Sequence, residues 1–121
     1  MATKSATVAA LNLIYIFSGK QKTQPHSQSI DINSELNGRY PLHYAADYGQ
    51  YDVLDYLISI GAKVNVTDKH EITPLLAAIW EGHTKCVQLL LEKGADKEGK
   101  TPDGSKYIDV AEKEEIRKLL L

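Results

Sequence analysis

The chain is poor in the residues that build disulfide frameworks and membrane spans. It has a single cysteine, Cys86, among 121 residues, which excludes a disulfide within the chain and fits a reducing compartment. The most apolar run, Val8 to Phe17, is interrupted by Asn12 and is too short to cross a bilayer. No small-residue cleavage site follows this run, so secretion is not expected. We therefore expect a cytoplasmic protein, with the nucleus as an additional location, and no membrane partner.

An excess of charge of one sign is also absent. The 14 basic and 16 acidic residues leave a net charge of −2, which does not suit a protein that binds nucleic acid by neutralising phosphates. The distribution is uneven, because residues 1–34 carry three lysines and one aspartate, whereas residues 35–121 carry 11 basic and 15 acidic side chains. The excess of acidic residues over 35–121 is consistent with a basic partner. It is equally consistent with charged residues on solvent-exposed helix faces that contact no partner.

What the chain does contain is a repeat with a period of 33 residues. Seven residues recur unchanged at this spacing, and three of them are glycine or proline. They are Pro41, Leu42, Ala45, Gly49, Leu57, Gly61 and Ala62, followed by Pro74, Leu75, Ala78, Gly82, Leu90, Gly94 and Ala95. A unit this short cannot bury its own apolar face, so neighbouring units must stack. A stack has an elongated surface without a deep cavity, which favours binding over catalysis, and we do not expect an enzyme.

Each unit is predicted to begin with a short helix. Pro41 and Pro74 suit the first position of a helix, where the missing N–H costs nothing. Thr73 precedes Pro74, and its hydroxyl can cap that helix. Gly49 and Gly82 are predicted to end these first helices after about two turns.

A second helix follows in each unit, over residues 51–60 and 84–93. Its apolar residues are Val53, Leu54, Leu57 and Ile58 in one unit and Val87, Leu90 and Leu91 in the next, which is helical spacing. Glycines 61 and 94 follow, where a residue with positive φ terminates a helix. The segments after them are rich in Asn, Asp, Gly and Pro, and predict turn-rich loops.

The two stretches Arg39–Ala46 and Ile72–Ala78 resemble the T-P-L-H-x-A signature of ankyrin repeats. The resemblance implies an all-α ankyrin-repeat solenoid of about three and a half helix-turn-helix units with β-hairpin-like loops. It predicts an ankyrin-repeat domain over residues 30–121, with repeats at about 35–67 and 68–100 and a shortened C-terminal cap at 101–121. Residues 1–29 fit the pattern poorly, and we expect a divergent N-terminal segment with one capping helix, Ala6–Phe17, over the end of the stack.

Several short motifs resemble the myotrophin family of small ankyrin proteins more closely. They are Tyr44–Asp47, Asp68–His70, Ile72–Leu76, Glu81–His83 and Gly94–Lys97. This resemblance implies binding to the heterodimeric F-actin capping protein, which the family keeps off filament barbed ends so that filaments grow. Residues 1–29 depart from that family, which opens with an ordinary repeat. The alternative is a general adaptor for another protein, such as a transcription factor or a kinase.

The segment Gly94–Thr101 matches the phosphate-loop pattern G-x-x-x-x-G-K-[ST]. That motif needs a strand before it and a helix after it, so that N–H groups converge on phosphate. Here a predicted helix precedes the segment and a turn at 102–104 follows, while Gly94 is explained by its counterpart Gly61. We expect no nucleotide and no cofactor.

His83 and Cys86 lie one helical turn apart, with His70 nearby in sequence. These groups do not make a zinc site, which usually needs four ligands or three and a water, and no metal is expected. His43 occupies the histidine of the ankyrin signature, where the ring is expected to bond backbone between units. We find no Ser/His/Asp or paired-carboxylate group that can be distinguished from residues already explained by the repeat.

The register places the candidate partner-binding residues at loop tips and on the exposed side of the first helices. They are Glu35, Arg39, Tyr44, Asp47, Tyr48, Lys69, His70, Trp80 and Glu81, and a wider strip adds Leu36, Asn37, Ile72 and Ala77. Aromatic side chains beside carboxylates are typical of interface hot spots. We expect the acidic residues to pair with a basic patch of the partner and Tyr48 and Trp80 to anchor in it, with the protein itself monomeric. The alternative is that Tyr44 and Trp80 pack between units and that the carboxylates are solvated.

Overall fold

The computed structural model describes Asn33, Glu35 and residues 37–121. The predictions for residues 1–29, including the capping helix at Ala6–Phe17, lie outside these residues. The described helices are α2 Pro41–Asp47, α3 Tyr51–Ser59, α4 Pro74–Glu81, α5 Thr84–Glu92, α6 Tyr107–Val110 and α7 Glu114–Leu120. None of these helices is long and apolar enough to cross a membrane.

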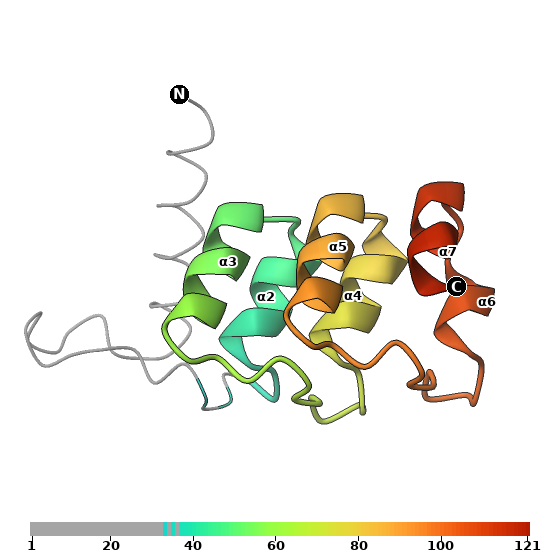
Figure 1. The fold of residues 1–121 in the computed structure, drawn as a ribbon. Coiled ribbons are helices and arrows are strands. Elements are labelled where there is room, and N and C mark those ends of the chain that lie inside the picture. Colours follow the sequence, from blue (N-terminus) through green and yellow to red (C-terminus); the bar gives the residue numbers. More distant parts are fainter. Residues whose placement is uncertain (1–32, 34, 36) are drawn as a thin grey trace, which may run out of the picture.

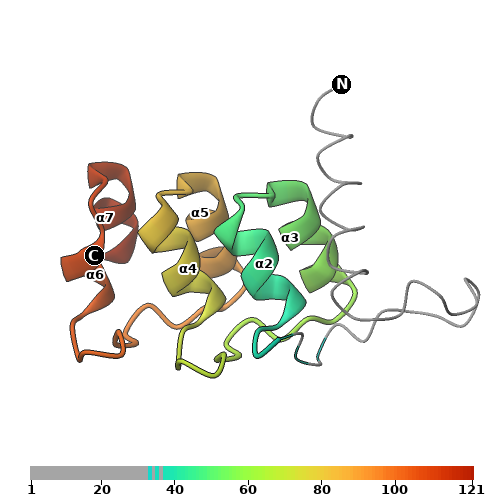
Figure 2. The same ribbon diagram turned by 180° about the vertical axis from the view of Figure 1, so that it is seen from behind.

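The helices form two layers that run along the chain order (Figure 1). In one layer α2 packs on α4 and α4 on α6, and in the other α3 packs on α5 and α5 on α7. Figure 2 shows the same stack from behind, and in both views the long loops lie along one edge. The first helices begin at Pro41, Pro74 and Tyr107, which are 33 residues apart. The predicted all-α ankyrin solenoid is confirmed.

The first helices of the two full units begin and end where the sequence predicts. Pro74 is the first residue of α4, and the Thr73 hydroxyl accepts a bond from the Leu76 N–H at 3.1 Å. Gly82 ends α4 with φ of 76°. Gly49 has φ of 69° and a second constraint, because a Cβ there would lie 2.5 Å from the His83 ring. Glycine at this position therefore serves both the turn and the packing between units.

The second helices share the core with the first helices. Helices α3 and α5 match the predicted ranges to within one residue. Val53, Leu54 and Leu57 of α3 are buried, as are Val87 and Leu90 of α5. Burying such side chains between units is what a single unit cannot achieve alone.

The last unit is shortened in its first helix. Helix α6 has 4 residues where α4 has 8, which accounts for the shortened C-terminal cap that the sequence predicts. Tyr107 takes the place of the helix-opening proline, and its hydroxyl lies 2.9 Å from the Thr73 hydroxyl of the preceding unit. Ile116 and Tyr107 are both buried, so the short unit still closes the core.

Asparagine side chains tie the loops of successive units together. The Asn33 side chain donates to the Gly61 carbonyl at 3.1 Å and accepts from the Lys63 N–H at 3.0 Å. Asn65 makes the same pair of bonds one unit later, donating to the Gly94 carbonyl at 3.0 Å and accepting a backbone N–H at 2.8 Å. Both asparagines therefore use their full amide to fix the loop after the second helix.

His43 makes the backbone bonds between units that the ankyrin resemblance implies. Its Nδ1 accepts from the Tyr40 N–H at 3.1 Å, so the proton is on Nε2, which donates to the Ile72 carbonyl at 2.6 Å. The side chain is fully buried. Burial lowers the pKa of His43 below 6.5. The hydrogen bond to the Ile72 carbonyl raises the pKa, but by less than burial lowers it.

We expect His43→Leu to flatten the pH dependence of stability between pH 7 and 5. In the native chain the pKa of His43 is lowered, so below about pH 6.5 the unfolded chain takes up a proton that the folded chain does not. The free energy of unfolding therefore falls as pH decreases, by up to about 1.4 kcal/mol per pH unit for one proton. Leucine occupies the same position one unit later, as Leu76.

Urea unfolding of both proteins at pH 7, 6 and 5 measures this slope. His43→Leu leaves the Tyr40 N–H without its partner and removes one of the two hydrogen bonds to the Ile72 carbonyl, which also accepts from the Asp68 N–H. Lower stability at every pH is therefore expected, and it does not affect the comparison of slopes. Equal slopes in the two proteins would contradict a neutral, buried His43.

Candidate partner-binding groove

A groove of about 270 Å³ lies between helices α2 and α4 and the loop that precedes α4. It brings together five of the predicted partner-binding residues and two residues of the wider strip. The lining consists of Arg39, Asp47, Asp68, His70, Ile72, Ala77, Trp80 and Glu81. The repeat register, which places the same face of successive units side by side, explains why residues more than 30 positions apart meet here.

Arg39 holds the groove together at one end. Its guanidinium lies 3.6 Å from the Asp47 carboxylate and 4.0 Å from that of Asp68, so it links the first unit to the loop of the second. It also lies over the Tyr44 ring, 4.9 Å from the centroid, in a cation–π contact. Arg39 is therefore partly engaged within the protein.

Asp68 is a groove residue that the sequence analysis did not single out. Its Oδ1 accepts from the N–H groups of His70 and Ile72, at 2.8 and 2.9 Å, and its side chain is only 3% exposed. An aspartate that bonds the backbone two and four residues ahead is a turn-forming pattern. The sequence signal that could have identified it is its place as an aspartate at the start of the turn Asp68–Ile72. Asp68 shapes the loop that carries His70.

Tyr44 is buried, unlike the other aromatic residues predicted to contact a partner. It is 7% exposed and belongs to the core, below the Arg39 guanidinium. Burial is the main cause that raises the pKa of its hydroxyl. The structure agrees with the alternative in which Tyr44 packs inside the stack, because a side chain so buried offers little surface to a partner.

The other two aromatic candidates are exposed. Tyr48 is 50% exposed and Trp80 47%, and of the two only Trp80 lines the groove. Glu81, next to Trp80, is exposed and has neither an ion pair nor a hydrogen bond through its carboxylate with the residues that the structure describes. Trp80, Glu81 and His70 are the exposed residues of the groove lining.

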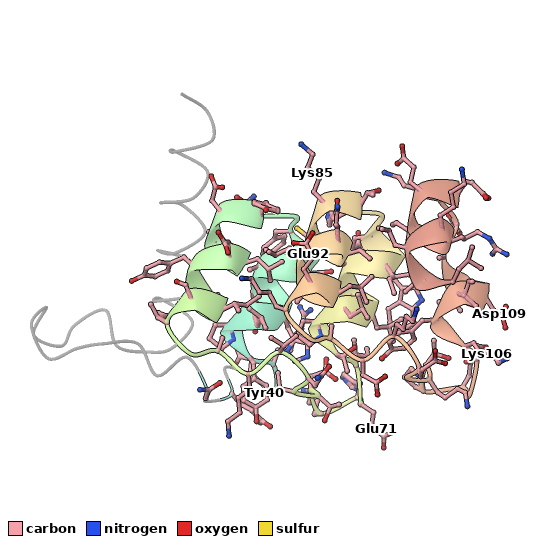
Figure 3. All side chains as sticks on the ribbon, in the orientation of Figure 1. Tyr40, Glu71, Lys85, Glu92, Lys106 and Asp109 are labelled. Carbon is pink, nitrogen blue, oxygen red and sulfur yellow. The ribbon has the colours of Figure 1, made fainter. Side chains whose placement is uncertain are left out.

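Glu35 and Lys69 are exposed but are not part of the groove lining. The Lys69 N–H donates to the Gly38 carbonyl at 3.0 Å, which joins the loops of two units. A Cβ on Gly38 would lie 2.5 Å from the Lys69 side chain, so the lysine stem runs along that loop. Lys69 therefore belongs to the loops along one edge of the stack, where Figure 3 labels Glu71.

The phosphate-loop pattern at Gly94–Thr101 lies in the wrong structural context. It follows helix α5, and the loop ends in a turn in which the Ser105 N–H donates to the Thr101 hydroxyl at 3.0 Å. Thr101 is buried and also donates to the Asp103 carboxylate. The threonine that would bind magnesium in a phosphate loop thus serves the turn.

Of the groups considered as metal ligands, His83 has another partner, Cys86 is buried and His70 is exposed. His83 Nε2 lies 3.1 Å from the Asp47 carbonyl oxygen, across the unit boundary. Cys86 is buried, and burial raises the pKa of its thiol to about 11, which keeps it protonated and unreactive at neutral pH. Within the described part of the chain, no three His, Cys, Asp or Glu residues are grouped so that they could hold a metal ion.

Similar proteins come from functionally diverse sources. The chain is 38% identical over 95 residues to the probable 26S proteasome regulatory subunit p28 of Saccharomyces cerevisiae, covering 77% of this chain and 41% of that one. It is 48% identical over 59 residues to 26S proteasome non-ATPase regulatory subunit 10 of Dictyostelium discoideum, covering 48% and 25%. It is also 45% identical over 73 residues to the human transient receptor potential cation channel subfamily A member 1, covering 58% and 6%. The chain spans less than half the length of each relative.

The family assignment rests on a longer match. Residues 3–101 match the family of ankyrin repeats in three copies, and the described helices have the corresponding two-layer arrangement. Proteins built from such repeats typically act as non-enzymatic protein–protein interaction modules. The narrower likeness to myotrophin depends on the short motifs alone. The chain therefore belongs to the ankyrin-repeat family of protein–protein interaction modules.

Proposed function

We propose that the groove between α2 and α4 binds another protein, and that this partner is the F-actin capping protein heterodimer. The observation that carries the binding site is Trp80, a large aromatic side chain that is 47% exposed in a groove shared with Asp47 and Glu81. Exposed tryptophan beside polar groups is the composition of an interface hot spot. The choice of partner is supported by the resemblance of five short motifs to the myotrophin family.

The charges of the groove favour a basic surface on the partner. Asp47 and Asp68 share Arg39, which leaves Glu81 as a carboxylate without an internal ion pair among the described residues. A partner cation at Glu81 would be attracted without first displacing another group. Trp80 would then be covered by less polar atoms of the partner. Such charge pairs mainly set the association rate and its salt dependence, while the aromatic anchor sets affinity.

In this proposal the protein acts by steric and electrostatic sequestration in the cytoplasm. It occupies the capping protein, keeps it away from filament barbed ends, and thereby promotes filament growth. Catalysis has no part in it.

An actin polymerisation assay with the full chain tests the proposal. Filament growth blocked by capping protein should be restored when the chain is added, and growth without capping protein should be unchanged. Unaltered inhibition by capping protein in the presence of a large excess of the chain would rule out this partner.

We expect Glu81→Arg to weaken this activity at low salt, because it places a cation against the basic partner surface. The difference from the unaltered chain should shrink as ionic strength rises, since salt screens exposed charges. Glu112→Arg changes the net charge equally at an exposed position outside the groove and should leave the activity unchanged. Equal loss in both variants would show that net charge, and not the groove, is responsible. Glu81 suits this test better than Asp47, whose replacement would also break the ion pair with Arg39.

The second candidate is a general adaptor for another protein. The observation in its favour is that the matched relatives are as different as a proteasome regulatory subunit and a cation channel, so repeats of this type occur in unrelated assemblies. The polymerisation assay separates the two candidates, because an adaptor without an actin role would not restore growth.

A further inference from the structure

Glu71 has a backbone conformation that favours glycine. Its φ is 65°, in the left-handed region, where the Cβ of an L residue lies too close to the following carbonyl oxygen. Among the described residues other than glycine, only Asn37 and Glu71 have a positive φ. Asparagine is one of the few residue types that adopt this conformation readily, and glutamate is not. The backbone is therefore strained at Glu71.

The repeat shows which residue this turn favours. Gly38 lies 33 residues before Glu71 and Gly104 lies 33 residues after it, and their φ values are 84° and 89°. The three residues thus occupy the same left-handed position in successive loops, and two of them are glycine. Only the loop that precedes α4 keeps a side chain there, at a cost in stability.

Hydrogen bonds within the turn hold Glu71 in this conformation. The Glu71 N–H donates to the Asp68 carbonyl at 3.0 Å, and the Asp68 N–H donates to the Ile72 carbonyl at 3.0 Å. The Asp68 carboxylate also accepts from the N–H groups of His70 and Ile72, on either side of Glu71. These bonds use only the backbone and the Asp68 side chain, so a glycine at position 71 would form the same turn.

The Glu71 carboxylate is available to a partner. The residue is exposed, and among the described residues its carboxylate has neither an ion pair nor a hydrogen bond. Figure 3 shows its side chain projecting from the edge formed by the loops, away from the helices. Its two neighbours in sequence, His70 and Ile72, line the groove between α2 and α4. Glu71 therefore places a negative charge beside the groove, on a loop of fixed geometry.

We propose that Glu71 is a further partner-binding residue, and that its carboxylate pairs with a lysine or arginine side chain of the partner. The inference rests on the function proposed above and adds a contact just outside the groove lining. Because the turn is already fixed in the free protein, its backbone loses little entropy when the partner binds. A strained residue that the turn itself does not need is typical of a functional site, where some stability is given up for binding.

Two reciprocal substitutions measure the strain by thermal unfolding of the full chain. Glu71→Gly should raise the Tm by about 4 °C, because glycine adopts a positive φ without a Cβ penalty. Gly104→Glu places the same side chain at the same turn position of the last unit, where an added Cβ meets open space, and should lower the Tm. Gly38 is unsuitable, since a Cβ there would lie 2.5 Å from the Lys69 side chain. An unchanged or lower Tm for Glu71→Gly would overturn the proposal.

Titration calorimetry with the capping protein heterodimer tests the contact itself. Glu71→Gly and Glu71→Gln should both raise the Kd about fivefold at low salt, the size expected for one exposed ion pair. Glu71→Gln keeps the length of the side chain and the strain, so its Tm should equal that of the unaltered chain. The difference in Kd should shrink as ionic strength rises. Gly104→Glu should bind as the unaltered chain does.

The outcomes separate this inference from the function on which it rests. Normal binding by both Glu71 variants would overturn the contact at Glu71 and leave the groove as the binding site. A lack of binding by the unaltered chain would overturn the proposed partner and this inference with it. A higher Tm together with a weaker complex for Glu71→Gly is the result that supports the proposal.

Discussion

Leu90→Ala is expected to lower the free energy of unfolding by about 2–5 kcal/mol. Leu90 is fully buried in α5, and α5 packs on α3, α4 and α7. Removing its methyl groups therefore leaves a cavity with neighbours on several sides, and such a site collapses poorly. The effect should be among the largest of any single core truncation in the described stack.

Urea unfolding followed by circular dichroism measures this loss. Gln88→Ala, an exposed position on the same helix, is the matched control and should change stability by less than about 0.5 kcal/mol. A loss below about 1 kcal/mol for Leu90→Ala would contradict the burial of Leu90 between units.

Trp80→Ala should weaken partner binding by about 2 kcal/mol or more, which is roughly a 30-fold rise in Kd. In the free protein Trp80 is 47% exposed, so a partner that covers it removes a large apolar area from water. Among the described residues that line the groove, the substitution also removes the only large aromatic side chain. Its effect on folding should be smaller than that of Leu90→Ala, because half of the side chain is already in solvent.

Titration calorimetry with the capping protein heterodimer measures the change in affinity. Tyr51→Ala removes an aromatic side chain of similar exposure, 42%, from α3 and outside the groove, and it should bind as the unaltered chain does. If Trp80→Ala also binds normally, the groove is not the contact surface. If both variants bind poorly, the loss has a cause common to the whole fold.

The helices were predictable because local rules and the repeat agree at every unit. Proline at the first helical position, glycine at the turn and paired apolar residues in the second helix all point to the same register. The boundaries of α3 and α5 therefore follow from the sequence to within one residue. The sequence also predicted a shortened last unit, and the 4-residue helix α6 accounts for it.

The inner wall of the groove was less predictable, because its contacts depend on side-chain conformations across units. Arg39 occupies the register position of Ile72, and nothing local indicates that it reaches both Asp47 and Asp68. The same arginine lies over Tyr44, which the register alone placed on the exposed strip. Only the packed structure shows that one cation occupies two of the carboxylates and covers the tyrosine.

The asparagine bonds between loops also determine how the molecule comes apart. The side chains of Asn33 and Asn65 bond to the loops that follow α3 and α5, so these links join neighbouring units. Loss of the C-terminal module would thus leave the rest of the array largely intact, and melting should proceed by fraying from a terminus. The stack then behaves as a short linear array of units coupled to their neighbours. A substitution that destabilises one terminal unit should therefore have little effect on the stability of the unit at the other end.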